Sequence, residues 1–238
     1  MGILATNTCG KLIPCTVFKE LSNKNRCNNI FRQKNNESKE KFMERAAKQT
    51  LNDEKDDILN LSNSEKFKMI NNHENLDILI DDENWEVRRE IANQGYGLDK
   101  LVNDENADVR VAVVRQGYGL DKLINDERWF VRFAVAKQGY GLDKLVDDKD
   151  LSVRVSVAEQ GYGLEKLIND EKWFVRAVVA RQGYGLDKLI NDKDWRVRVA
   201  VAKQGYGLDK LVNDRDWRVS AAVAKRSSGL NELVNDKS

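Results

Sequence analysis

The side chains best suited to metal or redox chemistry are three cysteines near the start of the chain. Cys9, Cys15 and Cys27 are separated by five and then eleven residues, and the chain has one histidine, His73. Thiolates and imidazole can hold a metal ion or an iron–sulfur cluster, so these residues are a candidate ligand set for a redox or metal protein. Their spacing lacks the close pairs typical of zinc sites. An odd number of cysteines without a secretory signal favours the other interpretation, reduced thiols in a cytoplasmic protein without a cofactor.

Arginine and aspartate recur together at a fixed spacing. Arginines lie 22 residues apart at Arg88, Arg110, Arg132, Arg154, Arg176 and Arg198. An aspartate row with the same period runs from Asp82 to Asp214. A row of free arginines would suit phosphate or peptide carboxylates, but like charges stacked at this spacing repel one another. We therefore predict that the arginines and aspartates of neighbouring units pair in a structural ladder.

Signatures of catalysis are missing from the sequence. One histidine leaves no histidine-based acid–base pair or multi-histidine metal site, and there is no Gly-x-Ser-x-Gly nucleophile motif. The recurrent Gly-Tyr-Gly follows a predicted helix rather than a strand, which argues against a dinucleotide-binding turn. The carboxylates occupy repeated positions, as on a solvated face. We interpret the protein as non-enzymatic.

The elements that must position these rows are short repeats. The six tyrosines lie 22 residues apart, at Tyr96, Tyr118, Tyr140, Tyr162, Tyr184 and Tyr206. The five tryptophans lie on a second lattice of the same period, at Trp85, Trp129, Trp173, Trp195 and Trp217. A short fixed period is the signature of a solenoid, in which each unit buries its apolar face against its neighbours. We expect the tryptophans to be buried between units, because Ala107 and Leu151 replace tryptophan in this row.

Each repeat is predicted to contain one helix and a short return. The run Val197–Ala202 alternates like a strand, but Val87–Asn93 breaks the alternation and favours a helix. We expect the aspartates of the Asp82 row to cap a helix of about eleven residues at its start. Gly95 and its equivalents would end this helix in the left-handed conformation, with the following tyrosine filling the corner. A short α or 3-10 segment over Leu98–Asn103 completes the unit.

One repeat motif resembles those of known helical-repeat families. Asp126-x4-Val131-Arg132-x2-Val135-Ala136, followed by a Leu-x2-Leu return, is similar to the leucine-rich-repeat variant family and, more loosely, to HEAT-like repeats. The resemblance implies an all-α fold, a right-handed α-solenoid of alternating α and 3-10 helices. It also implies two alternative functions. One is an N-terminal iron–sulfur module, for which the family has four cysteines and this chain three; the other is the nucleic-acid binding or base repair of some HEAT-like proteins.

The chain is predicted to divide into a basic front segment and a repeat array. Residues 1–50 contain the cysteines and hold ten Lys/Arg against four Asp/Glu, whereas residues 51–238, which carry the resemblance, hold 30 against 35. Within the array we expect a degenerate first unit at 51–81, seven units at 82–226 and a C-terminal cap at 227–238. The acidic balance of the array argues against nucleic-acid binding along its length.

Variable positions within near-identical repeats indicate a partner-binding surface. The position after the tryptophan varies most, through Glu86, Asp108, Phe130, Ser152, Phe174, Arg196 and Arg218. A second variable position runs through Asn93, Arg115, Lys137, Glu159, Arg181, Lys203 and Lys225. Stacking does not demand these side chains. Phe130 and Phe174, together with the tryptophans beside them, would form apolar contact points, or alternatively a neighbouring unit would partly cover them. We predict that the partner-binding residues are Trp129, Phe130, Trp173, Phe174, Arg196 and Arg218.

The sequence thus predicts a scaffold or adaptor that binds another macromolecule. A protein partner is favoured over nucleic acid or a membrane, and the protein is expected to be a monomer outside its complex. The pattern Met1-Gly2-x3-Thr6 fits N-myristoylation, which would add a membrane anchor. No stretch of the sequence is long and apolar enough to span a bilayer.

Overall fold

The structure is a computed structural model that describes residues 4–6, 12–14 and 39–235. The chain divides into two compact units, Met1–Asp82 and Glu83–Ser238.

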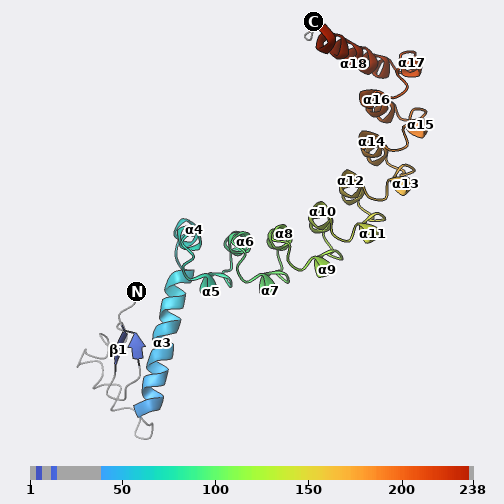
Figure 1. Ribbon diagram of the computed structural model, residues 1–238. Coiled ribbons are helices and arrows are strands. Elements are labelled where there is room, and N and C mark those ends of the chain that lie inside the picture. The colour runs from blue at the N-terminus through green and yellow to red at the C-terminus, as the bar shows by residue number, and fades with distance from the viewer. Residues whose placement is uncertain (1–3, 7–11, 15–38, 236–238) are drawn as a thin grey trace. The chain divides into compact units, whose positions relative to one another are not determined.

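The first unit contains two short strands and three helices among its described residues (Figure 1). Strands β1 (Leu4–Thr6) and β2 (Leu12–Pro14) pair antiparallel and were not expected from the sequence. They are followed by α3 (Lys39–Leu59), α4 (Asn63–Asn71) and α5 (Leu76–Leu79). The pair α4 and α5 has the order of a long helix and a short return.

The predicted boundary after residue 50 needs correction, because it falls inside α3. This helix continues unbroken to Leu59, since the sequence from 39 to 59 contains neither glycine nor proline. The two compact units divide after Asp82 instead. The degenerate repeat at 51–81 therefore belongs with the first unit and not with the regular array.

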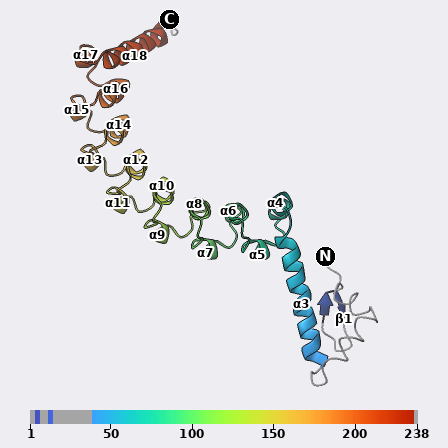
Figure 2. The same ribbon diagram turned by 180° about the vertical axis from the view of Figure 1, so that it is seen from behind.

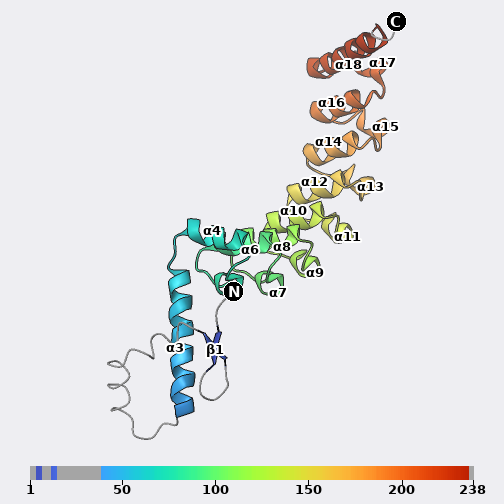
Figure 3. The same ribbon diagram turned by 60° about the vertical axis from the view of Figure 1, so that its left-hand side comes forward.

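In the second unit, long and short helices alternate. The long helices are α6 (Trp85–Asn93), α8 (Ala107–Arg115), α10 (Trp129–Lys137), α12 (Leu151–Glu159), α14 (Trp173–Arg181), α16 (Trp195–Gln204) and α18 (Trp217–Asn235). The short helices are α7 (Leu98–Leu101), α9 (Leu120–Leu123), α11 (Leu142–Leu145), α13 (Leu164–Leu167), α15 (Leu186–Leu189) and α17 (Leu208–Leu211). Figures 1, 2 and 3 show the long helices side by side in one row and the short helices in a second row. This alternation confirms the predicted helical solenoid.

Each long helix begins about two residues later than predicted. The cap of α12 is Asp150, whose side chain accepts from the N–H of Ser152. The aspartate predicted as the cap, Asp148, lies two residues upstream and accepts from the N–H of Asp150 at 2.8 Å. The Asp82 row is therefore not the cap row, and helices α6 to α16 are nine or ten residues long.

The Gly-Tyr-Gly corner ends each long helix as predicted. Gly139 has φ +73°, and the N–H of Tyr140 donates to the carbonyl of Val135 at 3.4 Å, the backbone bond of a Schellman motif. The second glycine, Gly141, is also left-handed, with φ +60°, which was not predicted from the sequence. The carbonyl of Gly141 accepts from the N–H of Leu145 and closes the single turn of α11. Two left-handed residues in close succession thus reverse the chain between the rows.

Three of the apolar rows that form the core of the second unit run through its long and short helices. The valines that begin with Val87 are fully buried in all seven long helices, and the row that begins with Ile91 lies beside them. The leucines equivalent to Leu101 are 2–3% exposed and cover these rows from the short helices. Because every row continues into the neighbouring repeat, each repeat supplies apolar cover for the next.

The last helix, α18, runs through the region that was predicted as a separate cap. Its backbone is helical from Trp217 to Asn235, whereas the cap was predicted at 227–238. Arg226-Ser227-Ser228-Gly229 stands where other repeats have Gln-Gly-Tyr-Gly, so the glycine that turns the chain is replaced by serine. Without a left-handed residue at this position the helix continues.

Candidate partner-binding face of the long helices

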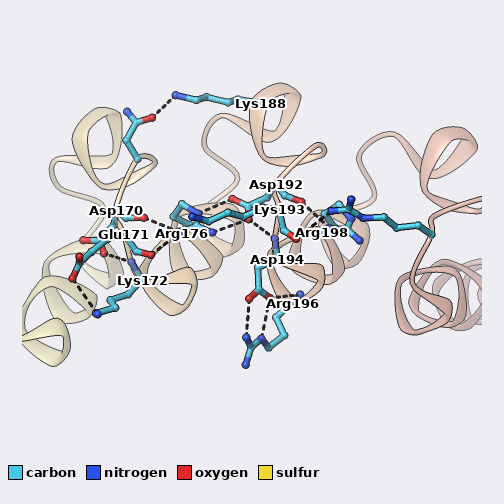
Figure 4. A network of polar contacts seen from close by, with 12 residues as sticks. Asp170, Glu171, Lys172, Arg176, Lys188, Asp192, Lys193, Asp194, Arg196 and Arg198 are labelled. Atoms are coloured by element: carbon cyan, nitrogen blue, oxygen red, sulfur yellow. Dashed lines mark hydrogen bonds and ion pairs between the residues drawn. The ribbon is translucent and has the colours of Figure 1, made fainter.

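A buried row of arginine–aspartate pairs joins neighbouring repeats, and Figure 4 shows one of these pairs, Arg176 with Asp192. Arg132 donates from Nε to Asp148 Oδ2 at 2.6 Å and from Nη2 to Asp148 Oδ1 at 2.8 Å. The same contact at 2.6 Å recurs in Arg88–Asp104, Arg110–Asp126, Arg154–Asp170, Arg176–Asp192 and Arg198–Asp214. This row, the Arg–Asp ladder, confirms the predicted pairing. In the first unit, Lys66 and Asp82 pair at 2.6 Å at the equivalent positions.

The ladder arginines are also hydrogen-bonded within their own repeats. Arg132 Nη1 donates to the carbonyl oxygens of Asp126 and Glu127 at 2.7 and 3.2 Å. The side chains of Arg132 and Asp148 are only 7% and 6% exposed. All three guanidinium nitrogens are thus engaged inside the array. The Arg–Asp ladder is a structural feature and offers no free cation to a ligand.

Burial and hydrogen bonding act in opposite directions on the pKa of the ladder aspartates. Burial raises the pKa of Asp148, but hydrogen bonds from Arg132 and from the Asp150 N–H lower it by more, so the pKa lies below its ordinary value. At Asp214 the hydrogen bond from Arg198 is the largest effect, and the pKa is again lowered. The same hydrogen bond raises the pKa of Arg198. Both partners therefore stay charged at neutral pH.

We expect the array to lose stability as the pH falls below about 4, since unfolded aspartate has a pKa of about 3.9. The pKa values of Asp148 and Asp214 in the folded state are lower than this. Their contribution is therefore complete above the unfolded pKa and is lost as the pH falls through the folded pKa. Thermal unfolding followed by circular dichroism between about pH 7 and pH 2 measures the effect.

Asp148→Asn is the matched variant for this titration, because it removes one titrating group from the ladder. It should unfold at a lower temperature at neutral pH and show a shallower decline on acidification. A melting temperature of the unaltered protein that stays constant through the acid range would contradict the prediction.

Two further rows of polar contacts account for other invariant residues. Gln116 Nε2 donates to the carbonyl of Asn93 at 2.8 Å, and Gln204 Nε2 donates to that of Arg181 at 2.9 Å, so glutamine covers the end of the preceding long helix. Between short helices, Lys210 Nζ donates to Asn191 Oδ1 at 2.7 Å, and Lys122, Lys166 and Lys188 make the equivalent contact. Neither row was predicted from the sequence, although the near-invariance of the glutamine and lysine positions was a signal for them. The invariant polar positions are thus largely used in stacking.

The variable positions lie on the outer side of the long helices. We define the long-helix face by three positions in helices α6 to α18: the tryptophan position, the residue after it, and the variable position eight residues after the tryptophan. On this face Trp129, Phe174 and Trp217 are 44%, 39% and 75% exposed, while Phe130 is half-buried. The prediction that the tryptophan row is buried is therefore wrong for Trp129 and Trp217. Trp85, Trp173 and Trp195 are partly covered.

Arginines of the next repeat provide part of that cover. The guanidinium of Arg196 lies 3.6 Å from the ring centroid of Trp173, and that of Arg218 lies 3.7 Å from the ring of Trp195. Each arginine is held by an aspartate of its own repeat: Arg196 donates to Asp194 at 2.9 and 2.7 Å (Figure 4), and Arg218 binds Asp216 in the same way. The hydrogen bond from Arg218 lowers the pKa of Asp216 to about 2.

The third position of the long-helix face is mostly basic. Arg115, Arg181, Lys203 and Lys225 are exposed and form no ion pair with any residue that the structure describes. Arg181 lies 5.7 Å from the ring of Phe174. The row is interrupted at Glu159, which pairs with Lys137 at 2.6 Å.

The six predicted contact residues form two groups. In the first group, Trp129 and Phe130 meet edge to face with their ring centroids 5.8 Å apart. The second group consists of Trp173, Phe174 and Arg196. Arg218 is stacked on Trp195 one repeat further on. The repeat of α12, with Leu151 and Ser152 at these positions, separates the groups. All six belong to the long-helix face by its definition, and their role in partner binding stays a prediction.

The other predicted site residues fall largely outside the described part of the chain. Cys9, Cys15 and Cys27 lie there, as does Gly2 of the myristoylation pattern. His73 is described and lies exposed in the turn after α4. Within the described ranges, no helix combines the length and the apolar character needed to cross a bilayer.

The alternating long and short helices and the Arg–Asp ladder that joins them define this chain as a helical repeat protein. No protein-family model matches the chain, and a search of curated proteins finds no match.

Proposed function

We propose that this protein is a non-enzymatic adaptor that binds a protein partner through the long-helix face. The observation that carries the proposal is the exposure of Trp129, Phe174 and Trp217 on the long-helix face, outside the apolar core. Aromatic and arginine side chains are the residues that most often dominate binding at protein interfaces. We place the adaptor in the cytoplasm, as a monomer outside its complex, in keeping with the odd number of cysteines in the sequence.

The charges of the long-helix face favour protein over nucleic acid as the partner. Nucleic-acid binding depends on unpaired cations that neutralise successive phosphates. Arg196 and Arg218 are each neutralised by an aspartate of their own repeat, and Glu159 interrupts the basic row. Among the cations of this face that form no ion pair with a described residue, Arg181 lies 5.7 Å from the ring of the exposed Phe174. A cation beside an exposed ring is suited to a partner with both apolar and acidic side chains.

The test is affinity purification with Phe130→Ser and Phe174→Ser in one variant. We expect the double variant to lose the partner, with each substitution weakening binding about tenfold or more. The melting temperature should change little, because neither side chain is in the core. Tyr162→Ser is the matched control, since Tyr162 is 43% exposed but lies at a corner away from this face.

Retention of the same partners by the double variant would overturn the proposal. So would salt-sensitive binding of single- or double-stranded DNA that matches or exceeds the binding of any protein. In that case the alternative of a HEAT-like nucleic-acid binder would stand.

A further inference from the structure

Two arginines of this chain occupy sites built from an aromatic ring and a carboxylate. Trp173 supplies the ring and Asp194 the carboxylate for Arg196. The Arg196 Cζ lies 3.6 Å from the centroid of the Trp173 ring, and Arg196 Nη2 donates to Asp194 Oδ2 at 2.7 Å. One repeat further on, Trp195 and Asp216 hold Arg218 with nearly the same distances, 3.7 and 2.7 Å. The ring comes from one repeat, whereas the carboxylate and the arginine come from the next.

A third ring and carboxylate stand at the same positions without an arginine. Trp129, Asp150 and Ser152 lie 44 residues, or two repeats, before Trp173, Asp194 and Arg196. Serine therefore replaces the arginine, and the ring of Trp129 is 44% exposed where that of Trp173 is partly covered.

The backbone around this third position matches that of the filled site. Asp150 caps α12 with φ −89° and ψ 129°, and Asp194 caps α16 with φ −95° and ψ 124°. Each aspartate accepts the N–H two residues on, and each donates its own N–H to the ladder aspartate at 2.8 Å. Trp129 meets Phe130 edge to face at 88°, as Trp173 meets its neighbouring phenylalanine at 87°.

We propose that Trp129 and Asp150 form a binding site for the guanidinium group of an arginine from a partner protein. A guanidinium is planar, so it can stack on an indole ring while its edge donates two hydrogen bonds to one carboxylate. The two filled sites show this arrangement within the same chain. Lysine fits less well, because an ammonium group can neither stack flat nor bind a carboxylate through a fork.

The two remaining tryptophans, Trp85 and Trp217, lack the carboxylate of such a site. The repeat after Trp85 has Asn106 at the carboxylate position, and Arg89 already lies 4.9 Å from the Trp85 ring. For Trp217, the equivalent position is Ser238. The vacancy is therefore specific to Trp129 and Asp150.

The site is tested on the full chain with N-acetyl-arginine amide as the probe and the indole N–H signals in a nitrogen-15 correlation spectrum as the readout. The Trp129 signal is assigned by its loss in Trp129→Phe. We expect this signal to shift and saturate with a dissociation constant on the order of millimolar. The citrulline amide, which has the shape without the charge, should leave the signal unchanged, and the lysine amide should bind several-fold more weakly.

Reciprocal substitutions separate the site from general surface effects. Ser152→Arg should fill the site from within and abolish the response of Trp129. Arg196→Ser should empty the filled site at Trp173 and Asp194, so that the Trp173 signal begins to respond to the probe. Asp150→Asn, which keeps a good helix cap, should weaken binding about tenfold.

The proposal is overturned if the Trp129 signal does not respond, responds equally to the citrulline amide, or still responds in Ser152→Arg. It deepens the proposed function, since the arginine is taken to belong to the partner, yet the two fail separately. If the protein captures a partner through Phe130 and Phe174 but the Trp129 signal does not respond to the probe, only the proposed arginine site is refuted. If the Trp129 signal responds as expected but no partner is captured, only the proposed adaptor function is refuted.

Discussion

Arg176→Ala is expected to lower the free energy of unfolding by about 3–5 kcal/mol, the usual cost of removing one partner of a buried ion pair. Arg176 donates to Asp192 at 2.6 and 2.8 Å and to the carbonyl oxygens of Asp170 and Glu171 at 2.7 and 3.2 Å. The side chains of Arg176 and Asp192 are 6% and 7% exposed. Alanine would leave a nearly buried carboxylate without its counter-ion and two carbonyl groups with one donor fewer.

The same helix provides the control. Arg181 is exposed at the end of α14 and forms no ion pair among the described residues. Arg181→Ala should therefore change the free energy of unfolding by no more than about 0.5 kcal/mol. Urea denaturation of both variants, followed by circular dichroism, makes the comparison. Equal losses in the two variants would show that the Arg–Asp ladder contributes nothing specific to stability.

Gly141→Ala is expected to cost about 2–5 kcal/mol, the sum of left-handed strain and overpacking. Gly141 has φ +60°, and a Cβ built on it would lie 2.1 Å from Ile124 Cδ1 and 3.4 Å from its Cγ1. Ile124 is 3% exposed, so its side chain has little room to move away. The substitution would push the short helix α11 away from the preceding repeat.

Gly139→Ala is the matched control two residues earlier in the same corner. Gly139 has φ +73°, but nothing lies within 4 Å of the position its Cβ would take. This variant should lose only the conformational cost, about 1–2 kcal/mol. Guanidinium denaturation of both variants measures the difference. If Gly139→Ala proves as costly as Gly141→Ala, the close approach to Ile124 has no energetic role.

Three arginine rows of one repeat array thus have different surroundings. Arg176 is enclosed in the ladder, Arg181 is exposed on the long-helix face beside the ring of Phe174, and Arg196 is stacked on the tryptophan of the preceding repeat. Residue type alone does not separate them. Invariance along the array marks the first, because every repeat uses this arginine to bind the ladder aspartate of its neighbour, and variability marks the other two, which lie outside the buried ladder.

The sequence by itself determined the architecture of the array. A 22-residue period, apolar residues at helical spacing and a glycine after each helix follow local rules of helix formation and termination. The Arg–Asp ladder could be predicted from charge repulsion alone. Repetition strengthened each inference, because the same pattern recurred in every unit.

The tertiary structure decided what depends on the neighbouring repeat. It showed that the residue that caps α12 is Asp150 and not Asp148 of the Asp82 row, since the aspartates of that row belong to the Arg–Asp ladder. It left Trp129 exposed while Arg196 covers Trp173, and so revealed the vacant site beside Asp150. A helix start or a corner is set by residues close together in the chain. The cover of a tryptophan is set by a side chain 23 residues away, and only the packing of one repeat on the next brings the two together.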